Sequence, residues 1–266
     1  MKLSNKSISL HPKLAAGLDL FFGVIFVWLL KHVGVWWALG VWLGFRMLLW
    51  GVLIRLVYFS PGIKRLSHFF SLLVFGVGSL LLLMFMDWSA AWWVVVLAFV
   101  TLPAISFGFL PAKEVELSFE AKPYRRWKFL LTIFGLMGIV SGLFAMAAFQ
   151  LFYNVNGLIY IAIAAISIGV ISVWWWNEYG VTLSRSIAVT VLMFMILMTE
   201  LILIVMIWPL GFLANGLIIV WWWYIGWLLV RFHLSKDGIV WKKQKWFLLF
   251  NTLAMFIFLV LVVRWK

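Results

Sequence analysis

The chain has 266 residues, of which 67% are hydrophobic and only 11% are charged. About a quarter of the residues in a soluble domain are charged, so this composition excludes a soluble globular protein. Cysteine does not occur, which excludes disulfides, iron–sulfur ligation and thiolate catalysis. Repeated apolar runs of about 20 residues, the length that crosses a hydrocarbon core, predict an all-α polytopic transmembrane bundle.

The apolar runs predict about nine helices within one membrane domain, residues 1–266. In chain order the predicted helices cover residues 14–30, 34–54, 68–86, 89–110, 129–152, 157–176, 186–208, 213–230 and 246–263. Polar and apolar residues alternate over 114–120, and Asp237-Gly238 is a turn signal, so small β elements are predicted outside the bilayer. Gly40, Gly44 and Gly51 allow close approach of a neighbour to the second helix.

Lys and Arg are unequally divided between the two sides of the predicted bundle. Seventeen of the 21 lie on one side: Lys2, Lys6, Lys13, Arg55, Lys64, Arg65, Lys113, Lys122, Arg125, Arg126, Lys128, Arg185, Arg231, Lys236, Lys242, Lys243 and Lys245. Lys31, Arg264 and Lys266 lie on the other side, and Arg46 lies inside a helix. Because cytoplasmic loops are enriched in Lys and Arg, the N-terminus is predicted to be cytoplasmic and the protein to lie in the inner cell membrane.

Residues near the helix ends predict contacts with the membrane–water interface. Indole rings favour that interface, so we expect Trp174, Trp175 and Trp176 to belong to an interfacial belt. Basic clusters on the inner side attract anionic lipid headgroups, at about 1 kcal/mol per charge. The expected headgroup-contacting residues are Arg125, Arg126, Lys128, Lys242, Lys243 and Lys245.

Two of the inner loops are similar, since each follows a Trp-rich helix and ends in a basic–aromatic cluster that opens the next helix. Aligning Phe129-Leu130-Leu131 with Phe247-Leu248-Leu249 gives a weak internal duplication of residues 11–128 and 129–246. Internal repeats are common in transporters, but the two halves share little identity outside this junction, which favours coincidence over duplication.

Asp19 and Arg46 are two ionisable residues inside predicted spans, where such groups are candidates for function. They lie equally far from the tight turn between His32 and Val33. Equal distance from the turn of an antiparallel hairpin means equal depth, so the sequence predicts an ion pair that fixes the hairpin register. A proton or ion relay, or an Arg46 that snorkels alone to the inner surface, are the alternatives.

Glu200 is the third intramembrane charge, and no Lys or Arg of a predicted span shares its depth. Hydrocarbon favours the uncharged form of a carboxyl group, so we expect a neutral hydrogen-bonding side chain. Tyr224, Tyr160 and Gln150 are its expected partners. Three interpretations stay open: a structural hydrogen bond between helices, a carboxylate that couples proton or substrate movement, and a contact to a partner subunit or lipid headgroup.

The second half contains Glu200, Pro209, Gly216, Tyr224 and Gly226 in that order, followed by a basic loop and a final helix. In this order, over residues 200–266, the chain resembles uncharacterised polytopic membrane proteins of small-genome bacteria. The resemblance implies a multi-pass topology and no particular activity.

The chemistry-bearing residues show no catalytic or metal-binding spacing. There is no H-E-x-x-H, no G-x-S-x-G and no phosphate-binding glycine loop, so no metal and no cofactor is predicted. The spans are poor in Ser, Asn, Gln and charge, which disfavours a pathway for a polar solute. An intramembrane enzyme acting on lipid is the least favoured function.

We therefore predict a non-catalytic membrane subunit or scaffold. Its expected surroundings are lipid with anionic headgroups on the inner side, together with a membrane-protein partner or a second copy, and no nucleic acid. The main alternative is a carrier of a lipid-like or other apolar substrate, with Glu200 as the coupling carboxylate.

Overall fold

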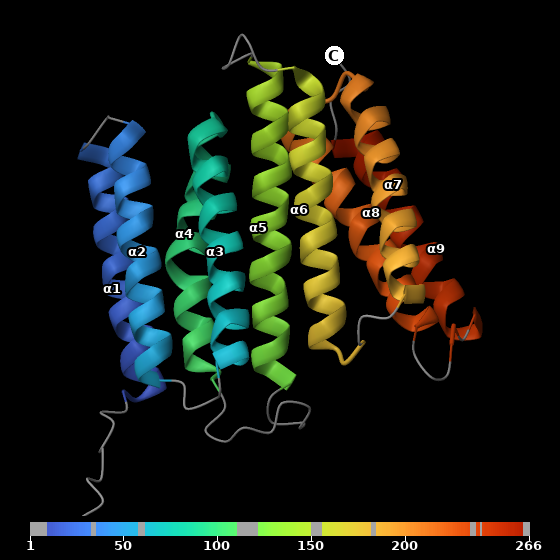
Figure 1. Ribbon diagram of the computed structural model, residues 1–266. Helices are drawn as coiled ribbons and strands as arrows, with labels where there is room; N and C mark the ends of the chain where they lie inside the picture. The colour runs from blue at the N-terminus through green and yellow to red at the C-terminus, as the bar shows by residue number, and fades with distance from the viewer. Residues whose placement is uncertain are drawn as a thin grey trace, which may run out of the picture. The chain divides into compact units, whose positions relative to one another are not determined.

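The computed structural model describes residues 10–32, 36–57, 62–110, 122–149, 156–181, 185–234, 238–239 and 241–262. All regular structure within these ranges is helical (Figure 1). The helices are α1 (Pro12–His32), α2 (Trp36–Val57), α3 (Gly62–Phe85), α4 (Ser89–Gly108), α5 (Lys122–Ala148), α6 (Gly157–Glu178), α7 (Arg185–Ile207), α8 (Phe212–His233) and α9 (Trp241–Ile257), which ends in a π-helical turn, Phe258–Val262. Each of these nine is long and apolar enough to cross a membrane. The prediction of an all-α, multi-pass membrane protein is therefore confirmed.

Three helices begin earlier than the apolar runs predict. α3 begins at Gly62, α5 at Lys122 and α9 at Trp241, five to seven residues before the predicted starts. All three added segments contain Lys or Arg, and a helix can continue into the interface because Lys and Arg side chains reach water from there. The shift brings His68 and Lys128, expected at or beyond helix ends, into the second turns of α3 and α5.

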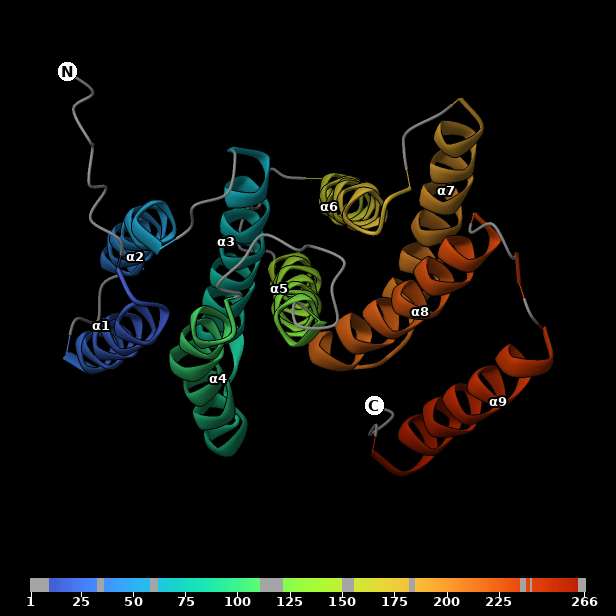
Figure 2. The ribbon, with the colours of Figure 1, turned by 90° about the horizontal axis from the view of Figure 1, so that it is seen from below.

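The chain divides into two compact units, residues 1–138 and 139–266, with the boundary inside α5. In unit 1, α1 packs against α2 and α4, and α3 packs against the same two helices; Figure 2 shows these helices from below. The interior of unit 1 is aromatic, because Trp50, Phe75, Phe99 and Phe107 are fully buried. The internal duplication is not tested by this division and stays a prediction.

Helices α3 and α5 meet through glycines. A Cβ atom added at Gly78 would collide with the backbone of Gly135, and one at Gly138 would collide with the backbone of Gly78. In contrast, a Cβ atom at Gly40 or Gly44 of α2 would have nothing within 4 Å. Among the described residues, no neighbouring helix therefore uses the close approach that Gly40 and Gly44 allow, since a small residue permits helix contact without specifying which face turns to a neighbour.

In unit 2, α7 packs against α6 and α8, and α6 also contacts α8. Trp175, Trp176, Trp223 and Trp227 are at most 1% exposed and fill the interior. The prediction that Trp175 and Trp176 form part of an interfacial belt is therefore wrong. Position along the sequence gives the depth of a Trp residue but not the face on which its ring lies.

Helix α9 is the least buried of the nine spans, because 6% of its apolar segment Gln244–Leu261 is buried. Its contact with α8 includes a hydrogen bond from Trp221 Nε1 to Asn251 Oδ1 at 3.1 Å. Gln150, Asp237 and the predicted β segment 114–120 lie outside the described residues.

Candidate functional site

Asp19 of α1 and Arg46 of α2 form a salt bridge in the interior of unit 1. Nη2 of Arg46 lies 3.3 Å from both carboxylate oxygens of Asp19, and Nε lies 3.3 Å from Oδ1. Trp50 adds a third donor, because its Nε1 lies 2.6 Å from the same Oδ1. The side chains of the ion pair are 2% and 0% exposed. The pairing predicted from equal distance to the turn is thus present.

Aromatic rings enclose the guanidinium group of this pair. The Cζ atom of Arg46 lies 4.2 Å from the ring centre of Phe99 and 5.0 Å from that of Trp50, both within the range of cation–π attraction. A Cβ atom at Gly23 would lie 3.1 Å from Arg46 Nη2, so a glycine leaves the room for the guanidinium group. Arg46 Nη1 is buried and has no hydrogen-bond partner among the described residues. These surroundings favour a register-fixing pair over a proton relay, which needs further titratable groups in line.

A second polar cluster joins the predicted cytoplasmic ends of α3, α4 and α5. Lys128 Nζ donates a hydrogen bond to Ser67 Oγ at 2.7 Å, and the ammonium lies 5.7 Å from the ring centre of Tyr124. His68 Nε2 lies 3.3 Å from Ser106 Oγ. All five side chains are buried. The cluster joins three helices by polar contacts where apolar packing alone would otherwise hold them.

Sequence reasoning missed this cluster, because it placed His68 and Lys128 at helix ends. Polar residues one helical turn apart give the missed signal: Ser67 and Ser71 on α3, and Lys128 and Thr132 on α5. In the structure Thr132 Oγ1 donates to the Lys128 carbonyl oxygen at 3.0 Å.

The expected headgroup-contacting residues have different environments. Lys128 is 4% exposed and directs its ammonium at Ser67, so it does not reach a headgroup in this conformation. Arg126, Lys242 and Lys245 are exposed, and Arg125 is half-buried. The side chain of Lys243 lies outside the described part of the chain.

Glu200 lies on the outward face of α7. Its side chain is exposed, and within the described ranges it has no hydrogen bond and no ion pair. Tyr160 is buried elsewhere, with a hydroxyl group that has no hydrogen-bond partner among the described residues. Tyr224 packs against the ring of Phe247, 6.5 Å between centres. The structure therefore brings neither tyrosine to Glu200.

Exposed apolar side chains surround Glu200 along α7, and together with it they are called the α7 stripe below. With about 100° of rotation per residue, the stripe extends roughly 60° to either side of Glu200. Its apolar members are Val189, Met193, Ile196, Leu197, Leu203, Ile204 and Ile207. Phe194, Met198, Ile202 and Val205, on the other side of α7, are buried. Glu200 is thus central to the face that the rest of unit 2 leaves uncovered.

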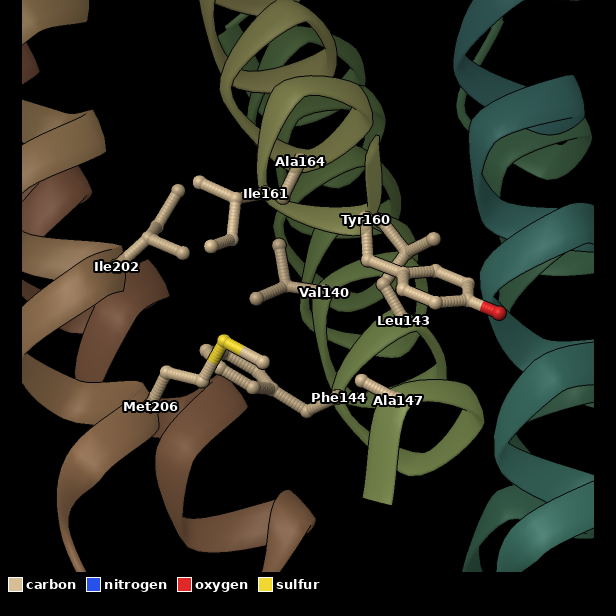
Figure 3. A pocket seen from close by; sticks show the side chains of 9 residues that line it. All are labelled: Val140, Leu143, Phe144, Ala147, Tyr160, Ile161, Ala164, Ile202 and Met206. Atoms are coloured by element: carbon tan, nitrogen blue, oxygen red, sulfur yellow. The ribbon is translucent and has the colours of Figure 1, made fainter. Parts of the chain in front are cut away.

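A small cavity lies between α5, α6 and α7 in unit 2 (Figure 3). Its empty space, part of which is open to the surroundings, is about 220 Å³, and it is lined by Val140, Leu143, Phe144, Ala147, Tyr160, Ile161, Ala164, Ile202 and Met206. Figure 3 shows the Tyr160 hydroxyl pointing away from the other lining side chains, so the lining is apolar. Glu200 precedes Ile202 by two residues, about 200° around the helix, and therefore faces away from the cavity.

Comparison of the chain with protein-family models, curated proteins and solved structures gives no match. In the described part of the chain, no three His, Asp or Glu side chains are grouped closely enough to bind a metal ion. The features of the described residues that bear on function are the ion pair, the polar cluster, the cavity and the α7 stripe.

Proposed function

We propose that the protein is a non-catalytic, multi-pass membrane subunit that binds another protein in the bilayer through the α7 stripe. The observation that supports this function is the position of Glu200, exposed at the centre of an otherwise apolar helix face. The unequal distribution of Lys and Arg supports a location in the cytoplasmic cell membrane with the N-terminus inside.

A carboxyl group that faces lipid is costly. Insertion measurements give about 2.5–3.5 kcal/mol for an acidic residue at the centre of a transmembrane helix. Glu200 lies seven residues before the end of α7, roughly 10 Å along the helix axis, which places it within the hydrocarbon. A protein partner that hydrogen-bonds Glu200 removes this cost, whereas lipid chains do not.

The other charged residues buried in the described spans each have a polar partner inside unit 1. Asp19 and Arg46 are bound to each other, and Lys128 is bound to Ser67. These contacts support a structural role for each charge rather than a role in a solute pathway. Glu200 is the charged side chain that favours an external contact.

The test is site-specific photocross-linking in native membranes. A benzophenone amino acid replaces Ile196 on the α7 stripe, and a matched protein carries it at Leu97, an exposed residue of α4. We expect a discrete protein adduct from position 196 and none from position 97. If both positions give only lipid adducts, the proposed function is wrong.

A carrier of an apolar substrate is the second candidate, favoured by the cavity between α5, α6 and α7. Under this hypothesis Ala164→Phe, which fills the cavity, would abolish the transfer of a fluorescent lipid across reconstituted vesicles. Ala162→Phe, at an exposed position of the same helix, is the control. Because Glu200 faces away from the cavity, we expect the purified protein to show no such transfer above empty vesicles.

A further inference from the structure

We infer that the partner on the α7 stripe is a second copy of the same chain, arranged so that the Glu200 side chains of the two copies hydrogen-bond to each other. This inference depends on the proposed function, because it names the occupant of the same face. It also gives the lone acid of α7 a specific role.

A protonated carboxyl group is self-complementary. It has one O–H donor and a carbonyl acceptor, so two such groups satisfy each other through a pair of hydrogen bonds. A two-fold axis places the same residue of both copies opposite itself, and most homodimers are built on such an axis. An axis that passes beside Glu200 therefore provides each carboxyl group with the partner that it lacks among the described residues of its own chain.

The residue composition of the α7 stripe suits this arrangement. On both sides of Glu200 its members are Val, Met, Ile and Leu side chains without a second polar group. Over residues 189–207, two copies of α7 can therefore lie along each other and bury one polar contact, between the two Glu200 side chains. Polar residues hydrogen-bonded across helices are a recognised source of association in membranes.

A salt bridge between Glu200 and a Lys or Arg residue of the second copy is disfavoured by the positions of the charges in the described helices. Near the middle of the described spans, Arg46 is the only Lys or Arg residue, and it is buried against Asp19. A second copy can therefore offer Glu200 its own Glu200 but no cation at that depth. A different protein with a basic residue in its span is the competing occupant.

Disulfide trapping tests the inference, because the natural sequence has no cysteine. Single variants Ile196→Cys and Ile204→Cys place a thiol on the α7 stripe, on either side of Glu200. Leu97→Cys on α4 and Phe250→Cys on α9 are exposed controls. After mild oxidation in membranes, we expect a covalent dimer of two 30.8 kDa chains from the two stripe variants and not from the controls.

Two substitutions of Glu200 test the hydrogen bonds themselves. Glu200→Gln keeps a donor and an acceptor and should retain trapping. Glu200→Leu removes both and should weaken dimerisation, roughly tenfold in dissociation constant. Equal trapping at stripe and control positions, or no effect of Glu200→Leu, would overturn the inference.

The photocross-linking experiment separates the two proposals. An adduct at position 196 with the mass of a different protein would show that the copy inference is wrong while the proposed function stands. No protein adduct at position 196 would overturn both proposals.

Discussion

Asp19 of α1 and Arg46 of α2 lie 3.3 Å apart, at equal distances along the chain from the turn that joins their helices. The pair is neutral as a whole, and Trp50 donates a further hydrogen bond to Asp19. Both helices are therefore fixed at one register, because a shift of either helix would separate two buried charges. The stability of unit 1 should depend on both partners being present.

Asp19→Leu should lower the free energy of unfolding by about 3–5 kcal/mol, because it leaves the Arg46 charge buried without its partner. The double variant Asp19→Leu/Arg46→Leu should regain most of that loss, since it buries no charge. Denaturant titration in mixed micelles measures both. Asp87→Leu, at an exposed acid between α3 and α4, is the control. A double variant as unstable as the sum of the single variants would contradict a register-fixing pair.

Gly78→Ala should lower the free energy of unfolding by about 1–3 kcal/mol, the usual cost of overpacking. The added methyl group would collide with the backbone of α5. Gly44→Ala should be neutral or stabilising by up to about 1 kcal/mol, because the site is open and Ala is the better helix former. Thermal unfolding of both variants in the same detergent compares the two. Equal losses would show that α3 and α5 do not touch at Gly78.

Lys128 should resist amine acylation by a water-soluble reagent, because its ammonium is buried and hydrogen-bonded to Ser67. Lys242 and Lys245 are exposed and should react fully under the same conditions. Peptide mass spectrometry of the labelled protein gives the extent at each residue. The expected difference disappears after unfolding in SDS. Equal labelling of the folded protein would return Lys128 to the headgroup-contacting set.

Trp223→Phe should destabilise unit 2, whereas Trp222→Phe should change its stability by less than about 0.5 kcal/mol. Trp223 is fully buried and donates a hydrogen bond to Ser172 Oγ at 2.8 Å. Its loss should cost about 1–3 kcal/mol, because a buried acceptor loses its donor and a void is left. Trp222 is 39% exposed on the same helix. Similar unfolding midpoints for the two variants would contradict this assignment.

The number and approximate limits of the helices were predictable, because a span needs a long apolar run and the runs here are long. The Asp19–Arg46 pair was also predictable, since a short turn sets the relative depth of two antiparallel helices. In both cases a length along the chain determines the result: the length of an apolar run sets a span, and the distance from a turn sets the depth of a residue.

Which face of each helix is buried could not be predicted. α7 is apolar on nearly all sides, so no pattern distinguishes the face toward α6 and α8 from the face toward lipid. Glu200 therefore had three open interpretations until the structure placed it on the exposed side. The same limit explains the wrong assignment of Trp175 and Trp176. Their positions along the helix could be predicted from the sequence, but the side of the helix on which their rings lie could not.

A contact through Glu200 is tested directly by the native mass of the protein released from membranes in a mild detergent, compared between wild type and Glu200→Leu. We expect a wild-type assembly heavier than one 30.8 kDa chain, and a larger fraction of single folded chains for Glu200→Leu at the same protein concentration. A wild-type protein that is monomeric under the same conditions would contradict the claim that the α7 stripe is a contact surface.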